Sequence, residues 1–99
     1  MIMAYDPGAI EATLAAAVGD DPGLIAELRI AFVDSAQRCL ALMEAARDGD
    51  GWTGAAWRLR GLAASFGAVR VMTLATEAAN VGGHDPVVLG KLRRVIARL

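Results

Sequence analysis

Three Asp-Pro pairs constrain the fold of this chain more than any other feature of its sequence. They are Asp6-Pro7, Asp21-Pro22 and Asp85-Pro86. An aspartate before a helix accepts hydrogen bonds from the first free backbone N–H groups. A proline at the first helical position loses nothing, because its missing N–H would have no partner there. Each pair therefore predicts the start of a helix.

The composition also favours helices. Of the 99 residues, 56% are hydrophobic, and alanine alone occurs 21 times. Alanine loses no side-chain entropy in a helix, whereas sheets favour the branched and aromatic residues that are scarce here. We find no strand pattern, repeat or low-complexity linker, so the sequence predicts an all-α protein.

Capping residues and apolar spacing predict five helices, at about 7–18, 22–47, 51–66, 68–80 and 86–99. Gly19 and Gly67 fit the ends of the first and third, and Asp50 is a candidate N-cap for the third. Short connections place neighbouring helices antiparallel. We expect one domain over residues 1–99, an antiparallel up-down four-helix bundle with a short N-terminal helix.

The expected helix over 22–47 carries two apolar stripes. One comprises Leu24, Leu28, Phe32, Cys39, Leu42, Met43 and Ala46, and the offset one comprises Ile30, Val33 and Leu40. Two stripes indicate burial on two sides, so this helix is expected in the middle of the bundle.

In the expected helix over 51–66, the large side chain of Trp57 points away from the face that forms the core. Its inward face is formed by Trp52, Ala55, Ala56, Leu59, Ala63 and Phe66. At about 100° per residue, Trp57 falls on the other side, among Thr53, Gly54, Arg60, Gly61 and Ala64. Trp57 either contacts a partner, as interface tryptophans often do, or covers a seam between helices.

Residues that carry out chemistry are sparse. His84 is the only histidine and Cys39 the only cysteine, and Cys39 has the spacing of a buried core residue. Metal sites need several ligands, and a serine nucleophile needs a base, which Ser35 and Ser65 lack nearby in the sequence. We expect no catalytic residue, no metal and no cofactor.

Charge is distributed unevenly along the chain. Residues 1–50 hold nine acidic and three basic residues, a net charge of −6, whereas residues 51–99 hold two acidic and seven basic, a net charge of +5. The second half therefore suits an acidic partner, unless its arginines only solvate helix faces. The pI of 5.7 argues against nucleic acid. With no signal peptide or membrane span recognisable, a cytoplasmic setting and no membrane partner are expected.

The segment AAWRLRGLAASFGA, residues 55–68, resembles the phosphosite helix of histidine-containing phosphotransfer (HPt) domains of bacterial two-component signalling. That helix follows the pattern Ala-His-x-Leu-Lys-Gly-Ser-Ala-Ala-Asn-Leu-Gly-Ala. The matching residues are Ala56, Leu59, Gly61, Ala63, Ala64, Gly67 and Ala68, with Arg60 in place of the lysine. Residues 21–50 are similar to the long preceding helix of the family and its acidic turn.

One departure from the family pattern affects function. Trp57 stands at the position of the phosphorylated histidine, and Leu62 stands where the family often has serine. An indole N–H only donates hydrogen bonds and cannot accept a phosphoryl group. The family's phosphotransfer activity is therefore not expected here, and His84 lies in a different element without the flanking motif.

The resemblance implies a docking module of phosphorelay signalling. Family members dock on acidic receiver domains with the phosphosite helix and its neighbour. We expect a non-phosphorylatable member that binds a receiver domain or a histidine kinase, with contacts from Trp57, Arg58, Arg60, Gly61, Leu62 and Ala64. The alternative is a self-associating helical module, a homodimer with Trp57 in its interface and no tie to phosphorelay.

Overall fold

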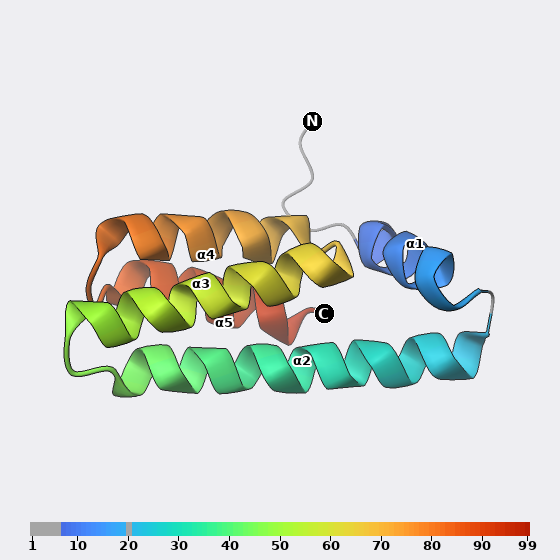
Figure 1. Ribbon diagram of the computed structural model, residues 1–99, viewed down its shortest axis with the longest axis horizontal. Helices are drawn as coiled ribbons and strands as arrows, with labels where there is room; N and C mark the ends of the chain where they lie inside the picture. The colour runs from blue at the N-terminus through green and yellow to red at the C-terminus, as the bar shows by residue number, and fades with distance from the viewer. Residues whose placement is uncertain (1–6, 20) are drawn as a thin grey trace.

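The computed structural model describes residues 7–19 and 21–99, and every regular element in them is a helix (Figure 1). The helices are α1 (Pro7–Val18), α2 (Pro22–Ala45), α3 (Gly49–Phe66), α4 (Val69–Val81) and α5 (Pro86–Ala97). The all-α prediction is confirmed, and the predicted bounds differ from these by two residues or fewer.

Two of the three Asp-Pro pairs cap helices as predicted. A carboxylate oxygen of Asp21 accepts from the backbone N–H groups of Gly23 and Leu24, at 3.0 and 3.2 Å. Asp85 caps α5 in the same way, accepting from Val87 and Val88 at 2.8 and 3.4 Å. The third candidate cap, Asp6, lies outside the described residues.

The predicted cap of α3 is wrong. The N-cap is Asp48, whose Oδ1 accepts from the N–H of Gly51 at 2.7 Å, and α3 therefore begins at Gly49. Asp50 lies in the first turn of the helix, where its negative charge faces the positive end of the helix dipole. Both aspartates suit a helix start, and the sequence did not distinguish the cap from the first turn.

Gly67 ends α3 as predicted, in a left-handed conformation with φ 70°. Its N–H bonds to the carbonyl of Ala64 at 3.3 Å, and the following Ala68 N–H bonds to that of Ala63 at 2.9 Å. A side chain at Gly67 would also collide with Thr13 of α1. The turn between α3 and α4 thus requires glycine for both its conformation and its packing.

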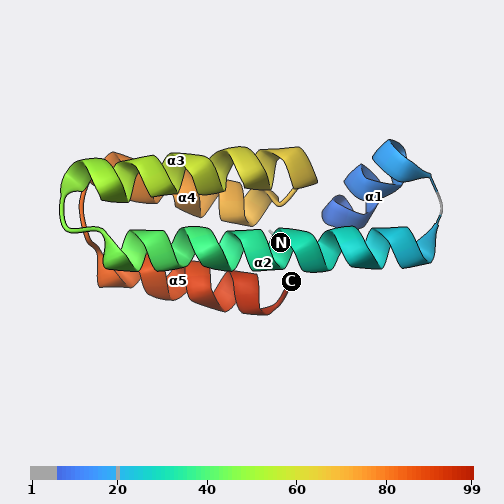
Figure 2. The same ribbon diagram turned by 60° about the horizontal axis from the view of Figure 1, so that its bottom comes forward.

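The core lies mainly between α2, α3, α4 and α5, and Ile10 and Leu14 of α1 belong to the same buried cluster. Helix α3 packs against α4 on one side and α2 on the other, and α5 contacts both α4 and α2. Figures 1 and 2 show these four helices side by side, with consecutive helices running in opposite directions, and α1 against the first part of α2. Buried hydrophobic residues form one cluster, to which α3 contributes Trp52, Ala55, Ala56, Leu59 and Ala63.

Trp52 fixes the relation between α3 and α4. Its side chain is buried, and its indole Nε1 donates to the carbonyl oxygen of Ala78 at 2.7 Å. Its ring centre also lies 5.5 Å from that of His84 in the loop before α5. The polar atom of this large core residue is therefore satisfied, as buried polar groups require.

The prediction that both apolar stripes of α2 are buried is wrong in part. Phe32, Cys39 and Met43 are buried as expected. Ile30, by contrast, is 69% exposed and Leu42 47% exposed. Periodicity identifies residues that share a helix face, but it does not reveal whether a neighbouring helix covers that face.

Within residues 7–19 and 21–99, no helix combines the length and the apolar character that crossing a lipid bilayer requires.

Candidate functional site

The candidate site is the outward face of α3, and Trp57 is its most prominent side chain. Trp57 is 46% exposed, whereas Trp52 on the opposite face is 1% exposed. The two tryptophans are five residues apart in one helix, which places them about 140° apart around its axis. The predicted position of Trp57 outside the core is confirmed.

Small residues surround Trp57 on this face. A Cβ built at Gly54 or Gly61 would have no neighbouring atom within 4 Å, and Ala64 is exposed. These positions therefore do not serve close packing against another helix in the described chain. The helix backbone beside Trp57 is accessible to an approaching partner, as expected from the helix wheel.

Arg60 lies over the ring of Trp57. Its guanidinium carbon lies 5.5 Å from the indole centre, a cation–π arrangement. Its Nε also donates to the hydroxyl oxygen of Thr76 on α4 at 3.1 Å, and that hydroxyl in turn donates to the carbonyl oxygen of Met72 at 2.9 Å. A positive charge is thus fixed beside an exposed aromatic ring.

Arg58 lies on the other side of Trp57, toward α2. With Leu42 and Gly54 it lines a shallow groove of about 450 Å³ between α2 and α3.

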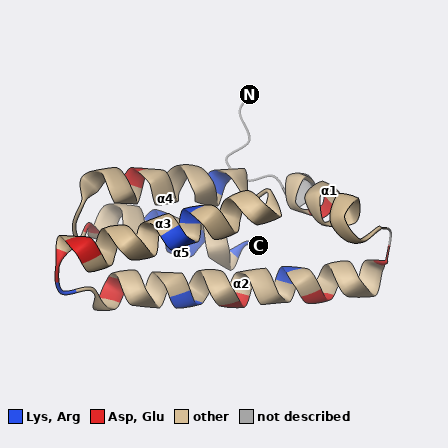
Figure 3. Ribbon diagram, viewed as in Figure 1, with Lys and Arg blue, Asp and Glu red and all other residues tan. Residues whose placement is uncertain are grey.

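Burial raises the pKa of the Cys39 thiol above its ordinary value, and the nearby charge of Arg58 partly opposes this. Figure 3 shows the basic segment of α3 between its acidic start and its C-terminal end.

Leu62 departs from the expected surface. It is half-buried and packs against the core cluster, so only part of its side chain is available to a partner. The remaining predicted residues Trp57, Arg58, Arg60, Gly61 and Ala64 are all exposed on α3. The structure thus brings five of the six predicted contact residues to an accessible surface.

Two residues of this surface were not predicted from the sequence. Thr76 supports Arg60 from α4, and Leu42 forms the α2 wall of the groove. The spacing of Leu42 predicts a position in the core, but the structure places this residue at the surface. No local pattern identifies Thr76, because its contact depends on how α4 packs against α3.

Reactive groups do not gather at this surface. His84 is exposed in the loop before α5, and Cys39 is buried in α2. Among the described residues, no three His, Cys, Asp or Glu side chains are grouped so that they could hold a metal ion.

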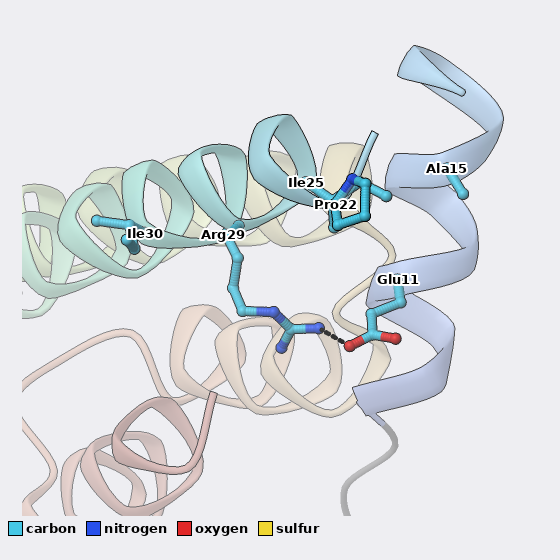
Figure 4. Close-up of a pocket in the computed structure, with 7 residues that line it drawn as sticks. Glu11, Ala15, Pro22, Ile25, Arg29 and Ile30 are labelled. Carbon is cyan, nitrogen blue, oxygen red and sulfur yellow. Dashed lines mark hydrogen bonds and ion pairs between the residues drawn. The ribbon is translucent and has the colours of Figure 1, made fainter. Parts of the chain in front are cut away.

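A second groove, of about 560 Å³, lies between α1 and the start of α2 (Figure 4). Arg29 crosses it, donating to Glu11 of α1 at 3.1 Å and to the carbonyl oxygen of Leu99 at 3.2 Å. These bonds tie α1, α2 and the end of the described chain together. The charged groups of this groove thus have a structural role.

Comparison with known proteins gave no match, whether to a protein-family model, a curated protein or a solved structure.

Proposed function

We propose that this protein is a non-phosphorylatable HPt-like module that binds a receiver domain or a histidine kinase through the outward face of α3. In this proposal the four helices α2 to α5 form an up-down bundle of the HPt type, preceded by the short α1. The protein acts in the cytoplasm, by occupying its partner and not by transferring phosphate.

The observation that carries the proposal is the exposure of Trp57. It lies at the position that the HPt pattern gives to the phosphorylated histidine, and it is 46% exposed. An acceptor histidine must be accessible to its partner, so a residue in that position on a retained docking surface should be accessible too. The open positions Gly54 and Gly61 on the same face support the same view.

The chemistry of the surface suits an acidic partner. Receiver domains present a cluster of acidic residues around their phosphorylated aspartate, as the family resemblance implies. Arg58 and Arg60 place one positive charge on each side of Trp57. Tryptophan and arginine are among the residues enriched at the positions that dominate binding energy at interfaces. Opposite charges also steer the two proteins together before contact.

In this proposal the protein modulates phosphotransfer by occupying its partner, as a decoy, an inhibitor or an adaptor. Trp57 fills the place where imidazole would attack the phosphoryl group, and indole has no free lone pair with which to do so. A receiver bound in this way keeps its phosphoryl group from other acceptors. Gly61 and Ala64 allow the close backbone approach, and the half-buried Leu62 contributes at the margin.

The proposal is tested by measuring binding to the receiver domains and histidine kinases of the same organism. At least one should bind the wild-type protein, and Trp57→Ala should weaken that complex by about tenfold or more. Val87→Ala is the matched control, since Val87 is also an exposed apolar residue, 65% exposed, but lies on α5. It should bind as the wild type does.

Two results would contradict the proposal. One is the absence of binding to every receiver domain and kinase tested. The other is a complex that Trp57→Ala and Val87→Ala affect equally, which would place the contact elsewhere on the molecule.

A further inference from the structure

The outward side of α2 is an exposed helix face that carries large apolar residues. Its central part, within six residues of Ala36, comprises Ile30, Ala31, Asp34, Arg38, Ala41 and Leu42, all exposed, and we refer to this part as the α2 outer face. The exposed residues Glu27 and Ala45 extend the same side of the helix at its two ends. Figure 1 shows α2 along one edge of the molecule, with the other helices on its opposite side. Ile30 is 69% exposed and Leu42 is 47% exposed, so this face leaves much apolar surface uncovered.

The residues of this face are symmetric about one position. Counted from Ala36, Ile30 and Leu42 are six residues away in opposite directions, Ala31 and Ala41 five, and Asp34 and Arg38 two. Each large apolar residue thus has a large counterpart, each alanine an alanine, and the acidic residue a basic one. Such a sequence can match a second copy of itself running in the opposite direction.

Helix geometry shows which residues would meet. At about 100° and 1.5 Å per residue, Ile30 and Ala41 lie on one side of the midline of the face and at similar distances from its centre, about 9 and 7.5 Å. Leu42 and Ala31 have the same relation on the other side. In an antiparallel pair, Ile30 therefore packs on Ala41 of the second copy, and Leu42 on its Ala31.

The charges match in the same arrangement. Asp34 and Arg38 form an ion pair of 2.6 Å within α2, and their side chains remain 57% and 75% exposed. In the antiparallel pair, Asp34 of one copy and Arg38 of the other lie at the same height along the helices. They are displaced sideways by about 5 Å, a gap that the long arginine side chain can span. Four alternating charges then replace two isolated pairs.

We propose that a second copy of this chain packs antiparallel on the α2 outer face, about a two-fold axis at the level of Ala36. A two-fold interface uses the same patch on both subunits, so the patch must complement itself. The pairing of large with small residues and of opposite charges meets this requirement. An unrelated partner would not require such symmetry. The proposal does not rest on the proposed function, because it needs neither Trp57 nor Arg60. Leu42 belongs both to this face and to the groove beside Arg58.

Sedimentation velocity over a range of concentrations tests the proposal on the full chain. The wild type should show a monomer–dimer equilibrium, and Ile30→Asp should raise its dissociation constant by about tenfold or more. Val87→Asp on α5 is the control of similar exposure, since Val87 is 65% exposed, and should dimerise as the wild type does. Trp57→Ala should also dimerise normally. Circular dichroism confirms that each variant is folded.

Exchange of the two charges gives a second test. Asp34→Arg alone and Arg38→Asp alone should each weaken the dimer, because like charges then meet across the axis. An equimolar mixture of the two variants should form a heterodimer, and the double variant should regain self-association. A wild type that stays monomeric at about millimolar concentration overturns the proposal. Loss of the dimer with Trp57→Ala but not with Ile30→Asp, or failure of the mixture to associate, does so too.

Discussion

The guanidinium carbon of Arg60 lies 5.5 Å from the centre of the Trp57 indole ring, and its Nε donates to the Thr76 hydroxyl at 3.1 Å. Arg60 therefore links an exposed ring on α3 to a polar group on α4. The link orients the aromatic ring before any partner arrives. Pre-orientation of this kind lowers the entropy that an interface side chain loses on binding.

Replacement of Arg60 should affect Trp57 more than it affects stability. Arg60→Ala should lower the free energy of unfolding by only about 0.5–1 kcal/mol, because both contacts are exposed to solvent. It should also make tryptophan emission easier to quench with acrylamide, since one face of the Trp57 ring loses its cover while Trp52 stays buried. Arg47→Ala, at an exposed position in the turn before α3, serves as control. Equal quenching in both variants would show that Arg60 does not shield the ring.

Replacing Gly61 or Gly67 of α3 and its C-terminal cap with alanine should change the free energy of unfolding in opposite directions. Gly61→Ala should raise the free energy of unfolding by about 0.5–1 kcal/mol, because alanine favours the helix and its Cβ meets nothing within 4 Å. Gly67→Ala should lower it by more than about 1 kcal/mol, because φ is 70° there and the added Cβ would collide with Thr13. Chemical denaturation measures both. A loss of stability with Gly61→Ala would place another group against that position.

The same method separates the two aspartates at the start of α3. Asp48→Ala should cost about 1 kcal/mol, since it removes the acceptor of the Gly51 N–H, a bond of 2.7 Å. Asp50→Ala should cost less, about 0.3–1 kcal/mol, because its role is only the interaction with the helix dipole. The reverse order would mean that Asp50 is the cap.

Much of the fold could be predicted from the sequence because its signals are local. Aspartate caps such as Asp21 and a glycine end such as Gly67 depend on a few neighbouring residues, and they placed the helix bounds closely. The exposure of Ile30 and Leu42 could not be found in this way. It depends on how many helices pack around α2. The identity of an apolar residue does not show whether another helix of the same chain or another molecule covers it.

In the candidate site, too, some features follow from local helical spacing and others depend on how the helices pack. The outward position of Trp57 follows from helical spacing, and so does the open surface at Gly61. The support of Arg60 by Thr76 spans 16 residues and depends on the packing of α4 on α3. The groove beside Arg58 likewise exists only because Leu42 of α2 lies next to α3.

The buried thiol of Cys39 predicts a dependence of stability on pH. Burial raises its pKa in the folded protein above the ordinary value of 9.0, so the folded state favours the neutral thiol. This contribution is fully present below pH 9.0 and is lost as the pH rises through the folded-state pKa. The wild type should therefore lose more stability between neutral and alkaline pH than Cys39→Ala does. Equal losses in the two proteins would show that the thiol ionises freely in the folded state.

The central claim is that Trp57 occupies the acceptor position of a docking surface that is still intact. Incubation of Trp57→His with a phosphorylated receiver domain tests it most directly, with a phosphotransfer protein of known activity as positive control. We expect transfer of the phosphoryl group from the receiver aspartate to the new imidazole, giving an acid-labile label on Trp57→His and none on the wild type. Val87→His, at a position on α5 that is 65% exposed and outside the proposed docking surface, should stay unlabelled. If Trp57→His takes no label from any receiver that labels the control protein, or if Val87→His is labelled equally, the claim is contradicted.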